Sequence, residues 1–173
     1  MKENPIRKPA RIATWALLII AAATAWSAVS ARRNGPLIVP TVSADEVFAY
    51  LREGRKVVFI DARERAEYSE SHIPGALNLS LRELEQMGHR GRELLGDPDL
   101  VVAYCLKDFR GFEVARALQG LGVPVASTLS EQGINGWKHR GLPVTSAGAA
   151  GDSEVERALA ACVEFPSSCG TAQ

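Results

Sequence analysis

One cysteine of this chain lies where a reactive thiol is expected. Cys105 follows an apolar run, residues 100–104, that is typical of a buried strand, and it precedes residues 112–118, whose apolar positions recur with helical period. Backbone N–H groups in such a loop, together with the helix N-terminus, stabilise a thiolate or a sulfur anion. Lys107 and Arg110 add positive charge to the same loop. The pattern predicts a nucleophilic cysteine, against the alternative of a small apolar residue that ends a core strand.

Several segments around this loop resemble those of one known family, the rhodanese-like sulfurtransferases. Residues 57–63 end in the family's Asp-x-Arg pattern, residues 67–78 contain its His-Ile-Pro-Gly-Ala signature, and residues 133–144 are similar to its closing segment. The similarity extends over roughly residues 43–144. It implies that Cys105 attacks a sulfane-sulfur donor such as thiosulfate, holds the sulfur as a persulfide, and passes it to a nucleophilic acceptor.

The resemblance also assigns roles to particular residues. Cys105 is the expected catalytic residue, Asp61 and Arg63 are expected to support the site, and the substrate-binding loop comprises Leu106, Lys107, Asp108, Phe109, Arg110 and Gly111. Two positions depart from the family pattern, because Asp108 replaces a frequent glycine and Gly111 replaces a frequent serine. The implied partners are a small sulfur-containing anion and a thiol or protein acceptor, with no cofactor.

Two other function classes remain open at this stage. The altered loop is compatible with a non-catalytic rhodanese-like module that binds or regulates a partner. A cysteine phosphatase is less favoured, because related phosphatases have five residues between the cysteine and the arginine of the loop. Only four residues separate Cys105 from Arg110, so the loop is one residue short for a tetrahedral phosphate.

The N-terminus carries an apolar segment that predicts a membrane anchor. Residues 12–29 contain no charged side chain, and eighteen residues are just enough for a spanning helix. Four basic residues precede the segment and two follow it, which favours an inside N-terminus. The prediction is a single-pass protein of a bacterial-type inner membrane, with its domain on the periplasmic or extracytoplasmic side. The alternative is a signal peptide cleaved near residues 29–31, which would release the domain into the periplasm.

The two cysteines of the C-terminal tail, Cys162 and Cys169, are close enough in sequence to form a disulfide in an oxidising compartment. The alternative is that both remain free thiols. No histidine or cysteine cluster has the spacing of zinc ligands, so no metal site is predicted. Basic and acidic side chains are equal in number, twenty each, which argues against a nucleic-acid partner.

The order of the expected elements predicts an α/β fold. Apolar strands near residues 57–60, 77, 100–104 and 123–127 alternate with helices over residues 43–52, 64–71, 81–87, 112–118 and 133–140. Such an alternation is typical of a rhodanese-like parallel sheet with helices on both faces, here preceded by one N-terminal hydrophobic helix. We expect an anchor or signal segment at 1–31, a linker at 32–42, the domain at 43–147, and a tail with a short helix at 148–173.

Overall fold

The computed structural model of the protein describes residues 38–107, 109–130, 132–147 and 152–165. Its centre is a five-stranded sheet with the strand order β1-β5-β4-β2-β3, in which every neighbouring pair is parallel. The strands are β1 (Thr41–Val42), β2 (Val57–Asp61), β3 (Leu77–Asn78), β4 (Leu100–Tyr104) and β5 (Ala126–Leu129). The sheet confirms the predicted parallel α/β architecture.

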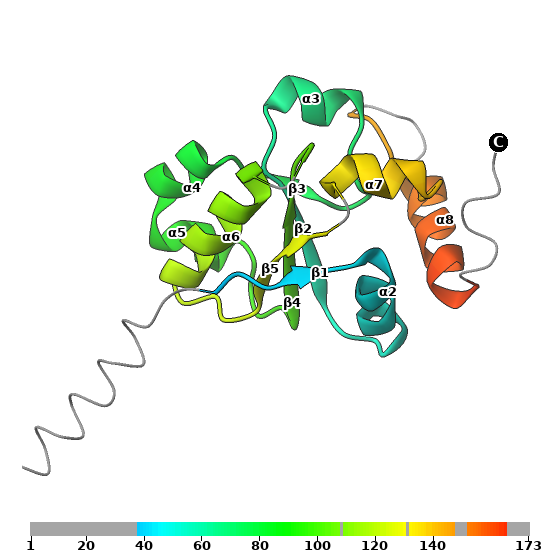
Figure 1. Cartoon of the computed structure of the whole chain (residues 1–173), viewed down its shortest axis with the longest axis horizontal. Helices are drawn as coiled ribbons and strands as arrows, with labels where there is room; N and C mark the ends of the chain where they lie inside the picture. The colour runs from blue at the N-terminus through cyan, green and yellow to red at the C-terminus, as the bar shows by residue number, and fades with distance from the viewer. Residues whose placement is uncertain (1–37, 108, 131, 148–151, 166–173) are drawn as a thin grey trace, which may run out of the picture. The chain divides into compact units, whose positions relative to one another are not determined.

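Helices cover both faces of this sheet (Figure 1). One face packs against α2 (Ala44–Arg52), α7 (Gly133–His139) and α8 (Asp152–Glu164). The other face packs against α4 (Leu81–Met87) and α6 (Phe109–Gly120), and α5 (His89–Glu93) packs against α4. The short helix α3 (Arg65–Glu70) follows β2 directly and lies beyond the carboxyl end of that strand.

The two faces have separate apolar cores because successive side chains of a strand point to opposite sides. The first core centres on Trp137, whose ring packs edge-on against Phe48 at 5.6 Å and Phe59 at 5.8 Å between centroids. Trp137 Nε1 also donates a hydrogen bond of 2.8 Å to the Pro143 carbonyl, so the buried indole has no unpaired donor. The second core lies under α6, and Cys105 belongs to it.

Local sequence signals define where the helices begin. Ser43 and Glu46 form the predicted capping box of α2, in which each side chain accepts a hydrogen bond from the backbone of the other residue. Ser80 and Glu83 form a second box at the start of α4. These two boxes fix the ends of helices that flank the carboxyl edge of the sheet.

Several predicted boundaries are wrong. The strand expected at 123–127 is β5 at 126–129, because Gly122 turns the chain with a φ of 82° and Pro124 has no N–H to donate to a ladder. The glycine-rich stretch that follows α4 contains a helix, α5, that the sequence did not predict. Helix α6 starts at Phe109, three residues before the expected start, and β1 lies within the predicted linker.

Two predicted features lie outside the described residues, namely the apolar segment 12–29 and Cys169. No helix among the described residues is long and apolar enough to cross a membrane. Cys162, on α8, is buried against the first core. The anchor and the Cys162–Cys169 disulfide therefore stay predictions.

Candidate active site

Cys105 lies at the carboxyl end of β4, where the chain turns toward α6. Its side chain is 3% exposed, and it is the free cysteine among the described residues. Its carbonyl oxygen accepts a hydrogen bond of 2.9 Å from the N–H of Ile134, which ties the start of the loop to α7. The structure thus places the predicted nucleophile where parallel α/β sheets commonly carry their active groups.

The first turn of α6 packs directly against the end of β4. A Cβ atom at Gly111 would lie 3.0 Å from Tyr104 Cα and 3.1 Å from the Ala103 carbonyl oxygen. Both atoms belong to the backbone of the central strand, so neither can move aside easily. This close approach gives a physical reason for the departure from the family's serine, because α6 leaves no room there for a side chain.

Arg110 is held by a partner that the sequence analysis did not identify. Its Nη1 and Nη2 atoms donate hydrogen bonds of 2.7 and 2.9 Å to the two carboxylate oxygens of Glu67. These bonds raise the pKa of Arg110 above its ordinary value, although burial lowers it. The charges of Glu67 and Cys105 also raise this pKa. Arg110 is therefore held by the Glu67 carboxylate at the helix end of the Cys105 loop.

The predicted supporting residues form a buried ion pair. Asp61 is fully buried and Arg63 is 3% exposed, with Arg63 Nη2 2.6 Å from Asp61 Oδ2. Arg63 also donates a hydrogen bond of 2.6 Å to the carbonyl of Ser71. Burial lowers the pKa of Arg63, but the hydrogen bonds and charge of Asp61 outweigh this effect and leave the pKa raised. The pair joins the end of β2 to the segment after α3, which is a structural role.

Tyr104 connects that ion pair to the strand that carries Cys105. Its ring is fully buried, and its hydroxyl oxygen accepts a hydrogen bond of 3.0 Å from the N–H of Ile73. Burial raises the pKa of Tyr104 far above its ordinary value, and the charge of Asp61 and a hydrogen bond to it add to the shift. The phenol therefore keeps its proton and is neutral. Sequence reasoning missed this residue because it looked like one more apolar position of the strand.

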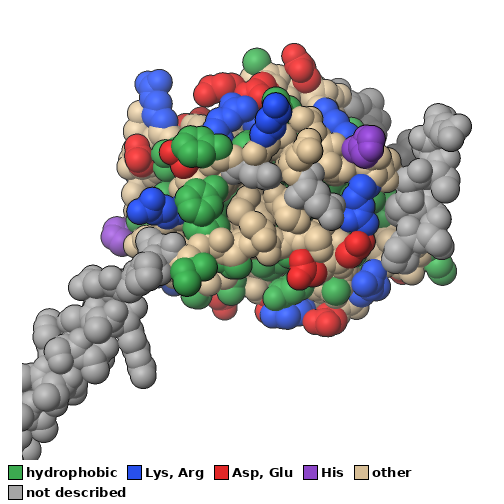
Figure 2. All heavy atoms as spheres, viewed as in Figure 1, with side chains coloured by type: hydrophobic (Ala, Val, Ile, Leu, Met, Phe, Trp, Pro, Cys, Tyr) green, Lys and Arg blue, Asp and Glu red, His purple; other side chains and the backbone are tan. Residues whose placement is uncertain are grey.

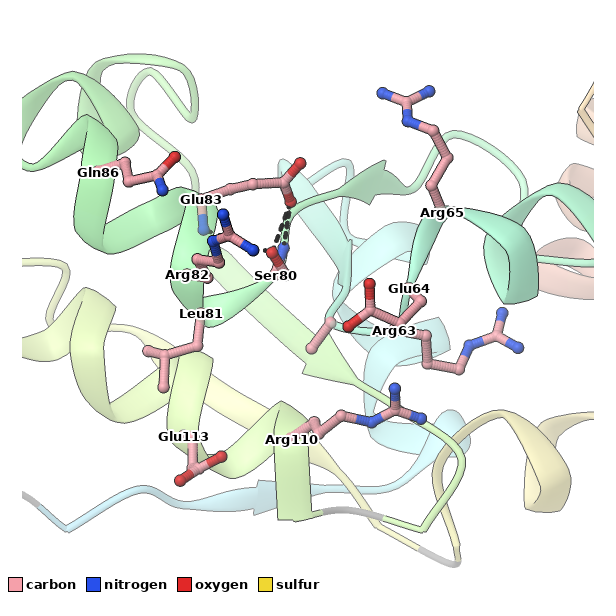
Figure 3. A pocket seen from close by; sticks show the side chains of 11 residues that line it. Arg63, Glu64, Arg65, Ser80, Leu81, Arg82, Glu83, Gln86, Arg110 and Glu113 are labelled. Atoms are coloured by element: carbon pink, nitrogen blue, oxygen red, sulfur yellow. Dashed lines mark hydrogen bonds between the residues drawn. The ribbon is translucent and has the colours of Figure 1, made fainter.

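A polar hollow of about 480 Å³ opens beside the loop, between α3, α4 and α6 (Figure 3). Arg110 and Glu113 of α6 border it, with Arg82 of α4 and Arg65 of α3 across from them. The four arginine side chains that line it point in different directions in Figure 3, and three glutamates line the same hollow. The hollow is therefore accessible to polar molecules without being a convergent anion clamp.

The described side chains of the loop differ in exposure. Leu106, Lys107 and Phe109 are exposed, Arg110 is partly buried, and Gly111 is buried. Asp108 lies outside the described residues. Among the residues that the structure does describe, no three His, Cys, Asp or Glu side chains gather closely enough to hold a metal ion.

The comparison with protein-family models decides the family. The model described as the rhodanese-like domain matches residues 43–140, a range that begins before α2 and ends after α7. The chain belongs to the rhodanese-like domain family. The family match includes the parallel sheet from β2 to β5 and the whole Cys105 loop.

The relatives of this rhodanese-like protein carry names of different functional classes. It is 36% identical over 97 residues to the HTH-type transcriptional regulator Rv0324 of Mycobacterium tuberculosis, a match that covers 54% of this chain and 39% of the regulator. It is 30% identical over 115 residues to Arsenate reductase 2.1 of Oryza sativa, covering 61% of this chain and 71% of the reductase. The solved thiosulfate sulfurtransferase of Pseudomonas aeruginosa is similar with a TM-score of 0.50 and 27% identity, over 71% of this chain and 24% of that one. The chain thus spans well under half of the regulator and of the sulfurtransferase.

Proposed function

We propose that this rhodanese-like protein is a sulfurtransferase that carries sulfur as a persulfide on Cys105. The observation that supports this most is the free cysteine at the end of β4, in a loop that ends at Arg110, which Glu67 holds at the start of α6. The Cys105 thiolate attacks the outer sulfur of a donor such as thiosulfate, the donor's S–S bond breaks, and sulfite leaves with the electron pair. An acceptor nucleophile then takes the outer sulfur from the persulfide and releases the Cys105 thiolate.

The geometry favours attack on the outer sulfur of a donor over reaction at the central atom of a phosphate or an arsenate. Reaction at that central atom needs an arginine whose guanidinium is available to the equatorial oxygens, preferably with two parallel hydrogen bonds. Here both terminal nitrogens of Arg110 are bonded to Glu67. The loop also has only four residues between Cys105 and Arg110. The arginine is therefore committed to positioning the loop, which leaves the phosphatase and arsenate-reductase alternatives with weaker support.

A steady-state assay tests the proposal. The full-length protein, incubated with thiosulfate and a thiol acceptor, should release sulfite continuously, and Cys105→Ser should abolish the release because the oxygen nucleophile forms no persulfide. Cys162→Ser is the matched control, since Cys162 lies on α8 against the other face of the sheet. Equal rates in the wild type and Cys105→Ser would contradict the proposal and favour a binding module.

We also propose that the domain acts outside the cytoplasm, attached to the membrane by residues 12–29. The support is the sequence alone, namely the uncharged segment and the excess of basic residues before it. In that compartment the donor and acceptor are molecules that reach the periplasmic side.

A further inference from the structure

Three apolar side chains are exposed on the loop that follows Cys105 and on the start of α6. They are Leu106, Phe109 and Phe112, which are 38%, 71% and 38% exposed, and we call these three side chains the collar. Phe109 and Phe112 are three residues apart on α6, so their side chains are neighbours on one side of the helix. Figure 2 shows hydrophobic side chains exposed on the face of the molecule that carries α6. A hydrophilic anion gains nothing from such a surface, whereas exposed apolar patches commonly mark contacts with other molecules.

The size of the collar limits what can occupy it. Its three side chains expose about 300 Å² of apolar surface, taking about 150–250 Å² for a fully exposed aromatic side chain. A stable protein interface buries about 800 Å² on each partner. The collar alone is therefore too small for a stable dimer of this chain, and its area fits a brief contact centred on the reacting group.

The charges near Cys105 indicate the chemistry of that occupant. Both terminal nitrogens of Arg110 are already bonded to the Glu67 carboxylate, so this guanidinium is not the group that meets an acidic side chain of a partner. Lys107, exposed beside the collar, is the cation that an arriving partner meets. Among the loop residues that the structure describes, Cys105 is thus followed by exposed apolar side chains and one exposed lysine.

We propose that the collar docks a polypeptide that presents a cysteine thiol to Cys105, with apolar residues beside that cysteine and an acidic residue facing Lys107. The inference rests on the proposed sulfurtransferase function and names its acceptor class. The partner thiol gives its proton to solvent and its thiolate attacks the outer sulfur of the Cys105 persulfide. The bond between that sulfur and Cys105 Sγ breaks, the Cys105 thiolate leaves, and the partner holds the persulfide, so no oxidant or reductant is needed.

Two synthetic peptides test this assignment. Both contain one cysteine and one glutamate, but in one peptide leucines flank the cysteine and in the other serines replace them. The full-length protein is loaded with sulfur from thiosulfate, freed of donor, and mixed with each peptide, and the mass of the peptide reports the transfer. The wild type should transfer sulfur at least about fivefold faster to the leucine peptide, since losing a central apolar contact costs more than about 1 kcal/mol.

Two variants test whether the collar, rather than another exposed apolar side chain, determines the ratio of the two rates. Phe112→Ser should bring the ratio of the two rates toward one. Leu94→Ser should keep the wild-type ratio, because Leu94 is 58% exposed but follows α5 and lies outside the collar. Equal rates to both peptides in the wild type would overturn the collar proposal, and so would an unchanged ratio of rates in Phe112→Ser. A wild-type protein that is a dimer, and that Phe112→Ser converts to a monomer, would also overturn it, because a second copy would then occupy the collar. Failure of Cys105 to load with sulfur would overturn the proposed function as well, so the two failures are distinguishable.

Discussion

The close approach of α6 to β4 predicts that a single added methyl group at Gly111 will disturb the loop. The new Cβ would lie 3.0–3.1 Å from backbone atoms of Ala103 and Tyr104, whereas ordinary van der Waals contact begins near 3.4 Å. The helix would therefore have to move away by a few tenths of an ångström. Overpacking of this kind costs about 1–3 kcal/mol, and the gain from replacing glycine by alanine in a helix, about 0.5–1 kcal/mol, offsets only part of it.

Gly120 provides the matched control because it is in the same helix and an added Cβ there meets nothing within 4 Å. Gly120→Ala should leave the free energy of unfolding unchanged or raise it slightly. Thermal unfolding should give a melting temperature for Gly111→Ala that is lower than that of Gly120→Ala by on the order of 3–15 °C. The sulfite-release rate of Gly111→Ala should also fall, since Arg110 and the loop move with the helix. If the two variants are equally stable and equally active, the packing argument is refuted.

Three further predictions concern the ion pairs and the N-terminal segment. Asp61→Asn leaves Arg63 buried without its carboxylate partner and should lower the free energy of unfolding in urea by about 3–5 kcal/mol. Asp45→Asn removes the carboxylate of an exposed pair and should lower it by less than about 1 kcal/mol. Equal losses in the two variants would contradict the prediction. The hydrogen bonds from Arg110 hold the pKa of Glu67 below its ordinary value of 4.5, so the pair stabilises the fold above that value and the contribution is lost as the pH falls through the lowered pKa. Melting temperatures should consequently fall more between neutral pH and about pH 3 in the wild type than in Glu67→Gln, and equal falls would argue against the pair. Leu18→Arg should move the protein out of the membrane fraction, since a central charge costs about 2.5–3.5 kcal/mol on insertion scales, and unchanged fractionation would exclude the anchor.

Features that depend on local sequence were predictable. The parallel sheet followed from apolar strands alternating with helices, and the position of Cys105 followed from the junction between one such strand and the next helix. The capping box at Ser43 was visible because its two members are three residues apart. Each of these signals lies within one segment of the chain.

Features that depend on packing between distant segments were not predictable. Glu67 and Arg110 are 43 positions apart, and only the fold shows that they pair. The hydrogen bond from the Ile73 N–H to the Tyr104 hydroxyl likewise joins two residues that are 31 positions apart in the sequence. In the sequence, Gly111 is only a departure from the serine that is frequent in the family, because the sequence does not show how closely α6 approaches β4. The sequence predicted Cys105 as the nucleophile, and the structure was needed to see what holds its loop.

The central claim is that Cys105 holds transferable sulfur, and intact-protein mass spectrometry tests it most directly. The full-length protein is incubated with thiosulfate, separated from the donor, and measured before and after addition of a thiol. We predict that the wild type gains the mass of one sulfur atom, that the thiol removes it, and that Cys105→Ser gains none. A wild-type protein that gains no sulfur, or a Cys105→Ser variant that gains as much, would contradict the account.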